Sequence, residues 1–205
     1  GGAKLGLTMP LLRKPHRRKL LESPFLPVWE HILESDVPYI QLLDASENMR
    51  LREIIMILLD EKYWEGCGEL EVTERMKVVL AAQAGIMLLH LDSTDYFHNV
   101  RSFLLYPAAY MQTQERMGSD GLVHSGSANL GEAWYNGPIV LSWKDSLQSS
   151  HTPGRGLNVV FHELAHAIDM MAGTTNGTPM LKNREDYAPW HKTMSATFET
   201  IRQRY

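Results

Sequence analysis

The strongest chemical signal in the sequence is a pair of histidines that flank a glutamate, in the run His162-Glu163-Leu-Ala-His166. In a helix, a spacing of four residues gives a rotation of about 400 degrees and a rise of about 6 Å, so both imidazoles leave one face. Imidazole nitrogens placed in this way can bind one Zn²⁺ at about 2.0–2.1 Å. Glu163 lies about 100 degrees further round, where it can reach a zinc-bound water without binding the metal. We therefore predict that His162 and His166 are zinc ligands and that Glu163 is the catalytic base.

The alternative is a pair of surface or capping histidines beside a helix salt bridge. We favour the metal site because the run lies within a segment of helical apolar period, formed by Val159, Val160, Leu164, Ile168 and Met171. We expect a set of apolar neighbours to bury the helix and to exclude water from the site, namely Val160, Phe161, Leu164, Ala165 and Ile168.

Asp169 follows His166 by three residues, on nearly the same predicted face. Its carboxylate could accept the free N–H of a ligand histidine and so orient the ring. An exposed acid near the end of the helix fits the sequence equally well.

A zinc hydrolase needs three protein ligands and a position open to water, and the third ligand is not evident. A histidine six residues beyond His166 is excluded, because position 172 is Ala. The downstream candidates are Glu185, Asp186 and Glu199, with His191 less favoured. None lies in a persuasive motif, and we expect the third ligand to be a glutamate beyond Tyr205.

Apolar periodicity and capping residues predict the elements that position this helix. We expect helices over 24–33, 47–62, 73–89 and 189–205, and strands over 100–106, 128–135 and 139–143. Asn136-Gly137 between two strand-like runs predicts a hairpin, and Pro138 indicates an edge strand or a strand start. An edge formed by residues 139–142 could bind an extended peptide as a further strand, although an ordinary strand is equally consistent.

The 205 residues are 44% hydrophobic, with a net charge of -4, which suits a globular domain with a real core. This charge gives no reason to expect nucleic acid as a partner. We interpret the basic run at 13–19 as part of a poorly ordered tail, 1–23, in preference to a contact with an anionic surface.

The sequence contains no apolar stretch long enough to span a bilayer, so we expect no membrane segment within this chain. Its single cysteine, Cys67, excludes an internal disulfide and fits a reducing compartment, so we expect a cytoplasmic protein. The sequence begins Gly1-Gly2 and not with Met, which leaves a membrane anchor upstream open.

Several stretches beyond the histidine motif resemble the bacterial zinc-dependent peptidases typified by Mlc titration factor A. Residues 158–169 look like the zinc helix of that family, and 137–143, preceded by 131–134, look like the strand before it. Residues 105–110, the helix at 76–89, and Arg184-Glu185 followed by Trp190 also fit. The likeness covers roughly 50–200, and a more distant one extends to the catalytic domain of anthrax lethal factor.

This resemblance implies a gluzincin site, with His162 and His166 as zinc ligands, Glu163 as general base and a glutamate as third ligand. The family carries that glutamate in a later helix, in an Asp-Pro-x-Glu-Phe-Phe-like stretch that is absent from this sequence. The resemblance also implies aminopeptidase-like activity and, in enteric bacteria, binding to a transcriptional repressor of the glucose system.

We therefore expect an α+β zincin-like domain over 24–205, lacking its C-terminal portion. It would have a helical N-terminal part, a small mixed sheet and a zinc helix. The predicted function is zinc-dependent hydrolysis of peptide bonds in a peptide or protein substrate. The alternatives are a catalytically weak or inactive binding module that docks a regulatory protein, and a metal hydrolase acting on non-peptide bonds.

Overall fold

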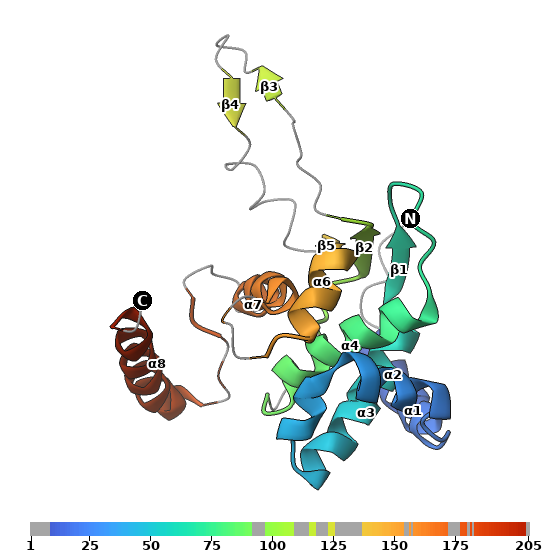
Figure 1. Cartoon of the computed structure of the whole chain (residues 1–205). Helices are drawn as coiled ribbons and strands as arrows, with labels where there is room; N and C mark the ends of the chain where they lie inside the picture. The colour runs from blue at the N-terminus through green and yellow to red at the C-terminus, as the bar shows by residue number, and fades with distance from the viewer. Residues whose placement is uncertain are drawn as a thin grey trace, which may run out of the picture.

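The computed structural model describes residues 9–91, 97–108, 115–117, 123–125, 137–153, 156, 158–171, 177–179, 181 and 183–203. These residues form a mixed α/β structure that is mostly helical, with a small parallel sheet at one side (Figure 1). The helices that pack around the core are α1 (Met9–Leu21), α2 (Pro27–Asp36), α3 (Ala45–Glu61), α4 (Glu74–Leu88), α6 (Trp143–Ser150) and α7 (Val159–Met171). The remaining helical elements are η1 (Pro38–Leu42), η2 (Arg184–Asp186) and α8 (Tyr187–Arg202).

The sheet has three parallel strands in the order β1-β2-β5, so the prediction of a mixed sheet is wrong for the described strands. The strands are β1 (Tyr63–Gly66), β2 (Ser102–Tyr106) and β5 (Ile139–Ser142). The predicted edge position of 139–142 is confirmed within the described part of the chain, where β5 pairs with β2 alone. Residues 128–136, the other half of the predicted hairpin, lie outside the described residues.

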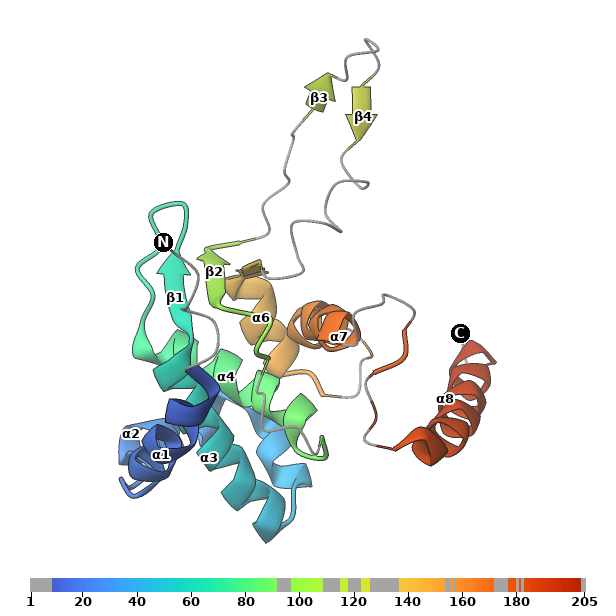
Figure 2. The same cartoon turned by 180° about the vertical axis from the view of Figure 1, so that it is seen from behind.

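A second, two-stranded sheet pairs β3 (Glu115–Met117) with β4 (Val123–Ser125) in antiparallel register. Both views place this pair well away from the three-stranded sheet (Figures 1 and 2). The sequence at 112–127 is polar and rich in glycine and serine, which predicts a loop and not strands.

Helices α3 and α4 form the centre of the core. Each begins at a side-chain cap: the carboxylate of Asp44 accepts the amide of Glu47 at 2.8 Å, and Thr73 Oγ1 accepts the amide of Met76 at 3.3 Å. The helices approach closely at Gly85, where an added Cβ would lie 2.6 Å from Leu51 Cδ1. Capping and apolar period together explain why both helices could be predicted from the sequence.

The predicted tail at 1–23 is wrong for residues 9–21, which form α1. This helix packs against α3, and two of its basic side chains bind acids there. Arg17 Nε contacts Glu61 Oε1 at 2.5 Å, and His16 Nε2 contacts Asp60 Oδ2 at 2.7 Å. The basic residues therefore had acidic partners in a distant helix, which a local pattern of charge does not reveal.

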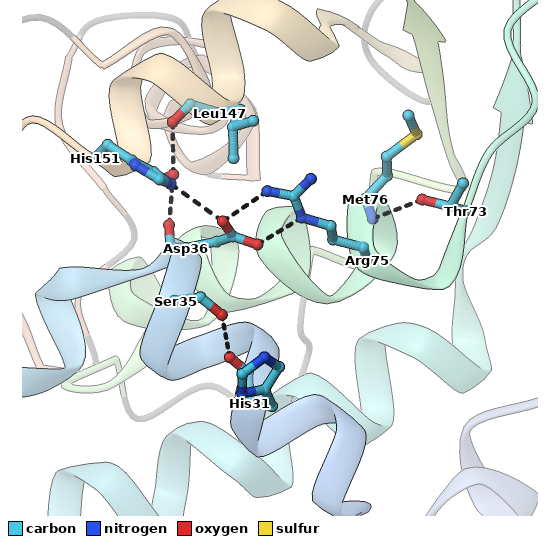
Figure 3. A network of polar contacts seen from close by, with 9 residues as sticks. His31, Ser35, Asp36, Thr73, Arg75, Met76, Leu147 and His151 are labelled. Atoms are coloured by element: carbon cyan, nitrogen blue, oxygen red, sulfur yellow. Dashed lines mark hydrogen bonds and ion pairs between the residues drawn. The ribbon is translucent and has the colours of Figure 1, made fainter.

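The buried carboxylate of Asp36 connects three helices, α2, α4 and α6 (Figure 3). Asp36, at the end of α2, is only 4% exposed and accepts two hydrogen bonds from Arg75 of α4, at 2.7 and 2.8 Å. His151, just after α6, contacts the same carboxylate at 3.3 Å, and Ser150 Oγ donates to the backbone oxygen of Asp36 at 2.7 Å. These bonds fix α6, on which α7 packs.

Within the described ranges, no helix combines the length and apolar character that crossing a membrane requires.

Candidate metal-binding site

Helix α7 carries the histidine motif and packs against α4, α6 and β5. Val160 and Leu164 are fully buried and Ala167 is 6% exposed, which places these three residues on the core side of the helix. The intervening His162, Ala165 and His166 are exposed. The helix predicted from apolar period is confirmed, and the two histidines of the motif lie on its solvent side. The expectation that Ala165 helps to bury the helix is wrong, because its Cα lies on the same side as the histidines.

The first turn of α7 is capped by groups on two elements. Asn158 Oδ1 accepts the amide of Phe161 at 2.9 Å, and Ser149 Oγ, from α6, accepts the amide of Val159 at 3.3 Å. The backbone oxygen of Asn158 accepts the amide of His162 at 3.0 Å. Amides that a helix would otherwise leave unpaired are thus satisfied, and the first histidine follows directly from a fixed turn.

The two imidazole rings lie side by side, with their centroids 4.8 Å apart and their planes at 89°. This is the adjacency that the four-residue spacing predicts. Among the described residues, neither ring has a hydrogen-bond partner, so the ring nitrogens are not committed to the protein interior. Exposed, adjacent imidazoles are suited to binding a borderline metal such as Zn²⁺.

Glu163 is half-buried and points around the helix from the two rings, between the core side and the solvent side. Such a carboxylate can exchange a proton with a group held at the rings while keeping its charge partly screened from solvent. Its role as a base stays a prediction, as do the roles of His162 and His166 as ligands.

Asp169 has a local partner: its Oδ1 accepts the backbone amide of Gly177 at 2.8 Å. In the described part of the molecule it makes no hydrogen bond to His162 or His166. This contact favours the simpler of the two predicted roles, an acid near the helix end that stabilises the following chain.

The downstream candidates for a third ligand lie on η2 and α8. Glu185, Asp186 and His191 are exposed, and Asp186 accepts hydrogen bonds from the backbone and side-chain amides of Asn183 at 3.1 and 3.0 Å. Glu199 pairs with Arg202 at 3.8 Å. Within the described ranges, no three His, Cys, Asp or Glu side chains come together to hold a metal ion.

Asn99 supports α7 from a residue that the sequence did not single out. It is 5% exposed and lies in the segment before β2, and its Nδ2 donates to the backbone oxygen of Ala167 at 2.8 Å. The sequence signal is a pair of polar residues, His98 and Asn99, between the apolar Phe97 and Val100, which does not by itself identify a partner.

Two adjacent imidazoles and a carboxylate thus lie on a helix that packs at the edge strand of a small sheet. The chain belongs to the glucose-regulated metallo-peptidase M90 family, whose sequence model matches residues 12–205. This membership implies a metal ion, and the donor set fits one in part, because two imidazoles are free to bind it.

Sequence relatives of the chain agree with this membership. The chain is 32% identical over 184 residues to Mlc titration factor A of Yersinia pestis and, with the same figures, to that of Yersinia pseudotuberculosis. The match covers 88% of this chain and 65% of those proteins, so the chain spans about two thirds of their length. It is also 30% identical over 205 residues to an uncharacterized protein of Synechocystis sp., with 96% of this chain and 74% of that protein covered.

Proposed function

We propose that this protein is a zinc-dependent peptidase of the gluzincin type, in which His162 and His166 bind the metal and Glu163 is the general base. The observation that carries the proposal is the pair of exposed rings, 4.8 Å apart on one face of α7. Membership of a metallo-peptidase family supports it. The third ligand, a glutamate in this proposal, comes from outside the described residues.

Each residue of the motif has a separate chemical task. When bound, Zn²⁺ supplies Lewis acidity, which lowers the pKa of water and polarises a peptide carbonyl. Glu163 accepts the proton of the attacking water and passes it to the leaving amine. His162 and His166 hold the ion as neutral imidazoles on a helix whose opposite face is anchored in the core.

Strand β5 gives the proposed substrate a place to bind. Its outer edge has no paired strand among the described residues, and it packs against α7. An extended peptide can add to such an edge through main-chain hydrogen bonds, which brings its carbonyls past the helix. We propose an aminopeptidase-like activity in the cytoplasm, since the lone Cys67 fits a reducing compartment.

Replacing Glu163 with Gln tests the assigned base. Glutamine keeps the shape of the side chain but cannot accept a proton, so Glu163→Gln should retain zinc and lose peptide hydrolysis by at least about a hundredfold. Glu34→Gln, at an exposed glutamate of α2, is a matched control and should leave turnover unchanged. A panel of peptides, esters and simple amides measures the rates. Parent-like cleavage of peptides by Glu163→Gln would exclude the assigned role, and cleavage of esters or simple amides by a parent that cleaves no peptide of the panel would point to a non-peptide substrate.

A second candidate function is a binding module that docks a regulatory protein, with hydrolysis weak or lost. The relatives named Mlc titration factor A favour it, since their name refers to Mlc, and a transcriptional repressor is the partner we propose in this case. Zinc content separates the two functions. A protein that never holds about one zinc per chain, yet binds such a repressor, would support the binding module.

A further inference from the structure

Gln83 is a polar residue in the middle of an apolar helix. It lies in α4 and is fully buried, as are Val79, Leu80 and Ala84 on the same helix. A buried amide costs free energy unless both of its ends are hydrogen-bonded. Here both ends are used: Nε2 donates to the backbone oxygen of Ser146 at 3.3 Å, and Oε1 accepts Nδ2 of Asn158 at 2.9 Å.

Asn158 extends this series of hydrogen bonds to α7. Its Nδ2 binds Gln83, while its Oδ1 caps the amide of Phe161 at 2.9 Å. Its backbone oxygen also accepts the amide of His162 at 3.0 Å. A continuous series of hydrogen bonds therefore joins the centre of the core to the backbone of the first histidine.

Capping alone does not require this series. A serine at position 158 would also satisfy a first-turn amide, without a hydrogen bond to Gln83 of α4. What Gln83 adds is a fixed point on the most buried helix, which restrains the side chain of Asn158 and, through it, the rotation of the first turn of α7. A metal site needs such restraint, because a ligand that turns away loses its bond to the ion.

We propose that Gln83 and Asn158 are positioning residues that set the orientation of α7, so that His162 and His166 present their rings to the same metal ion. This inference rests on the proposed function, since it concerns the site at which zinc would bind. The pair touches neither metal nor substrate and acts through the backbone of α7.

Two variants remove the hydrogen bond between Gln83 and Asn158 in different ways, and one matched variant leaves it intact. Gln83→Met keeps the side-chain length and removes both hydrogen bonds. Asn158→Ser keeps a capping oxygen and is too short to reach Gln83. Ser146→Ala is the control: it removes a buried hydroxyl that has no partner among the described residues, while the backbone oxygen bound by Gln83 remains.

The experiment measures two quantities in the intact protein: the exchange rates of the amides of Phe161 and His162, and the affinity for Zn²⁺ in competition with a chelator. In Gln83→Met and Asn158→Ser we expect exchange to be faster by about tenfold and zinc affinity to fall by about tenfold, with Ser146→Ala like the parent. If Gln83→Met does not fold, Asn158→Ser decides.

Exchange rates equal to those of Ser146→Ala would overturn the proposal. So would faster exchange with unchanged zinc affinity, because the pair would then stabilise the helix and nothing more. If the parent itself binds no zinc, the proposed function fails. The positioning role then fails with it, whereas a parent that binds zinc, together with variants that exchange like Ser146→Ala, would reject the positioning role alone, so the two failures are distinguishable.

Discussion

Helices α7 and α8 have similar apolar periods and very different surroundings. In α7, Val160 and Leu164 are fully buried against the core. In α8, no residue is buried, and Met194, Phe198 and Ile201 are 49%, 63% and 53% exposed. The principal contacts of α8 among the described residues are with η2, and both views show it apart from the other helices (Figures 1 and 2). An amphipathic pattern thus predicts a helix, while its placement depends on partners supplied by distant parts of the chain.

Truncating one apolar side chain on each helix should give the largest difference. Leu164→Ala leaves a cavity in the core and should lower the free energy of unfolding by about 3 kcal/mol. Phe198→Ala, on the exposed face of α8, should change it by less than about 0.5 kcal/mol. Urea unfolding measures both. Equal losses would mean that α8 packs as firmly as α7 and would remove the contrast.

The ion pair of the buried Asp36 with Arg75 and the exposed ion pair of Glu199 with Arg202 on α8 should also differ in what they contribute to stability. Arg75 lowers the pKa of Asp36 through its hydrogen bonds and its charge, against the opposing effect of burial. Because the folded state holds this carboxylate ionised, its contribution to stability is present above the unfolded pKa of about 4 and is lost as pH falls through the folded pKa. Asp36→Asn should therefore cost about 2 kcal/mol at pH 7, and the difference from the parent should shrink below about pH 4.

The matched control for Asp36 is Glu199→Gln on α8, where the pair with Arg202 is exposed and 3.8 Å long. Such a pair contributes little, so the change should stay within about 0.5 kcal/mol at every pH. Thermal unfolding between pH 3 and 8 compares the variants. A cost for Asp36→Asn that does not vary with pH would show that the network acts through packing and not through charge.

The smallest of these effects concerns single hydrogen bonds to helix backbone. Asn99→Ala removes the buried bond to Ala167 of α7 and should cost about 1 kcal/mol. Thr197→Ala removes a bond to Thr193 within α8 and should be close to neutral, because the freed oxygen is exposed to water. Urea unfolding again measures both. A neutral Asn99→Ala would show that α7 does not need this support.

Local signals were enough to predict several elements. Capping and apolar period predicted α4 at 73–89, and the apolar period that begins at Val159 predicted α7. Strand β5 was predicted from the strand-like run beside Asn136-Gly137 and from Pro138, although its parallel pairing with β2 was not. Pairing depends on a strand distant in the sequence, so no local pattern specifies it.

Other elements escaped prediction for identifiable reasons. Pro15 and the density of positive charge disfavoured a helix in α1, whose stability comes partly from Glu61 on α3. Helix α6 is short and polar, and its first residue, Trp143, had been assigned to the preceding strand. Ser142 caps it by accepting the amide of Asp145 at 3.3 Å. Such caps are hard to recognise when the residues that follow lack a helical apolar period.

For the candidate site, the sequence predicted that the side chains of His162 and His166 lie together. It predicted few of the contacts that hold their helix in place. A spacing of four in a helix is enough to bring His162 and His166 together, because helix geometry alone fixes their separation. The contacts of Gln83 and Asn99 with this region join residues far apart in the chain, so spacing carries no signal for them. A third ligand on another element is unpredictable for the same reason.

Zinc content of the intact protein, measured for the parent and three single variants after dialysis, tests the central claim most directly. The account predicts about one zinc per chain in the parent and in His31→Ala, which alters an exposed histidine of α2, and a loss of most of it in His162→Ala and His166→Ala. A parent without zinc, or variants at His162 and His166 that hold as much as His31→Ala, would contradict the assignment of a metal to α7.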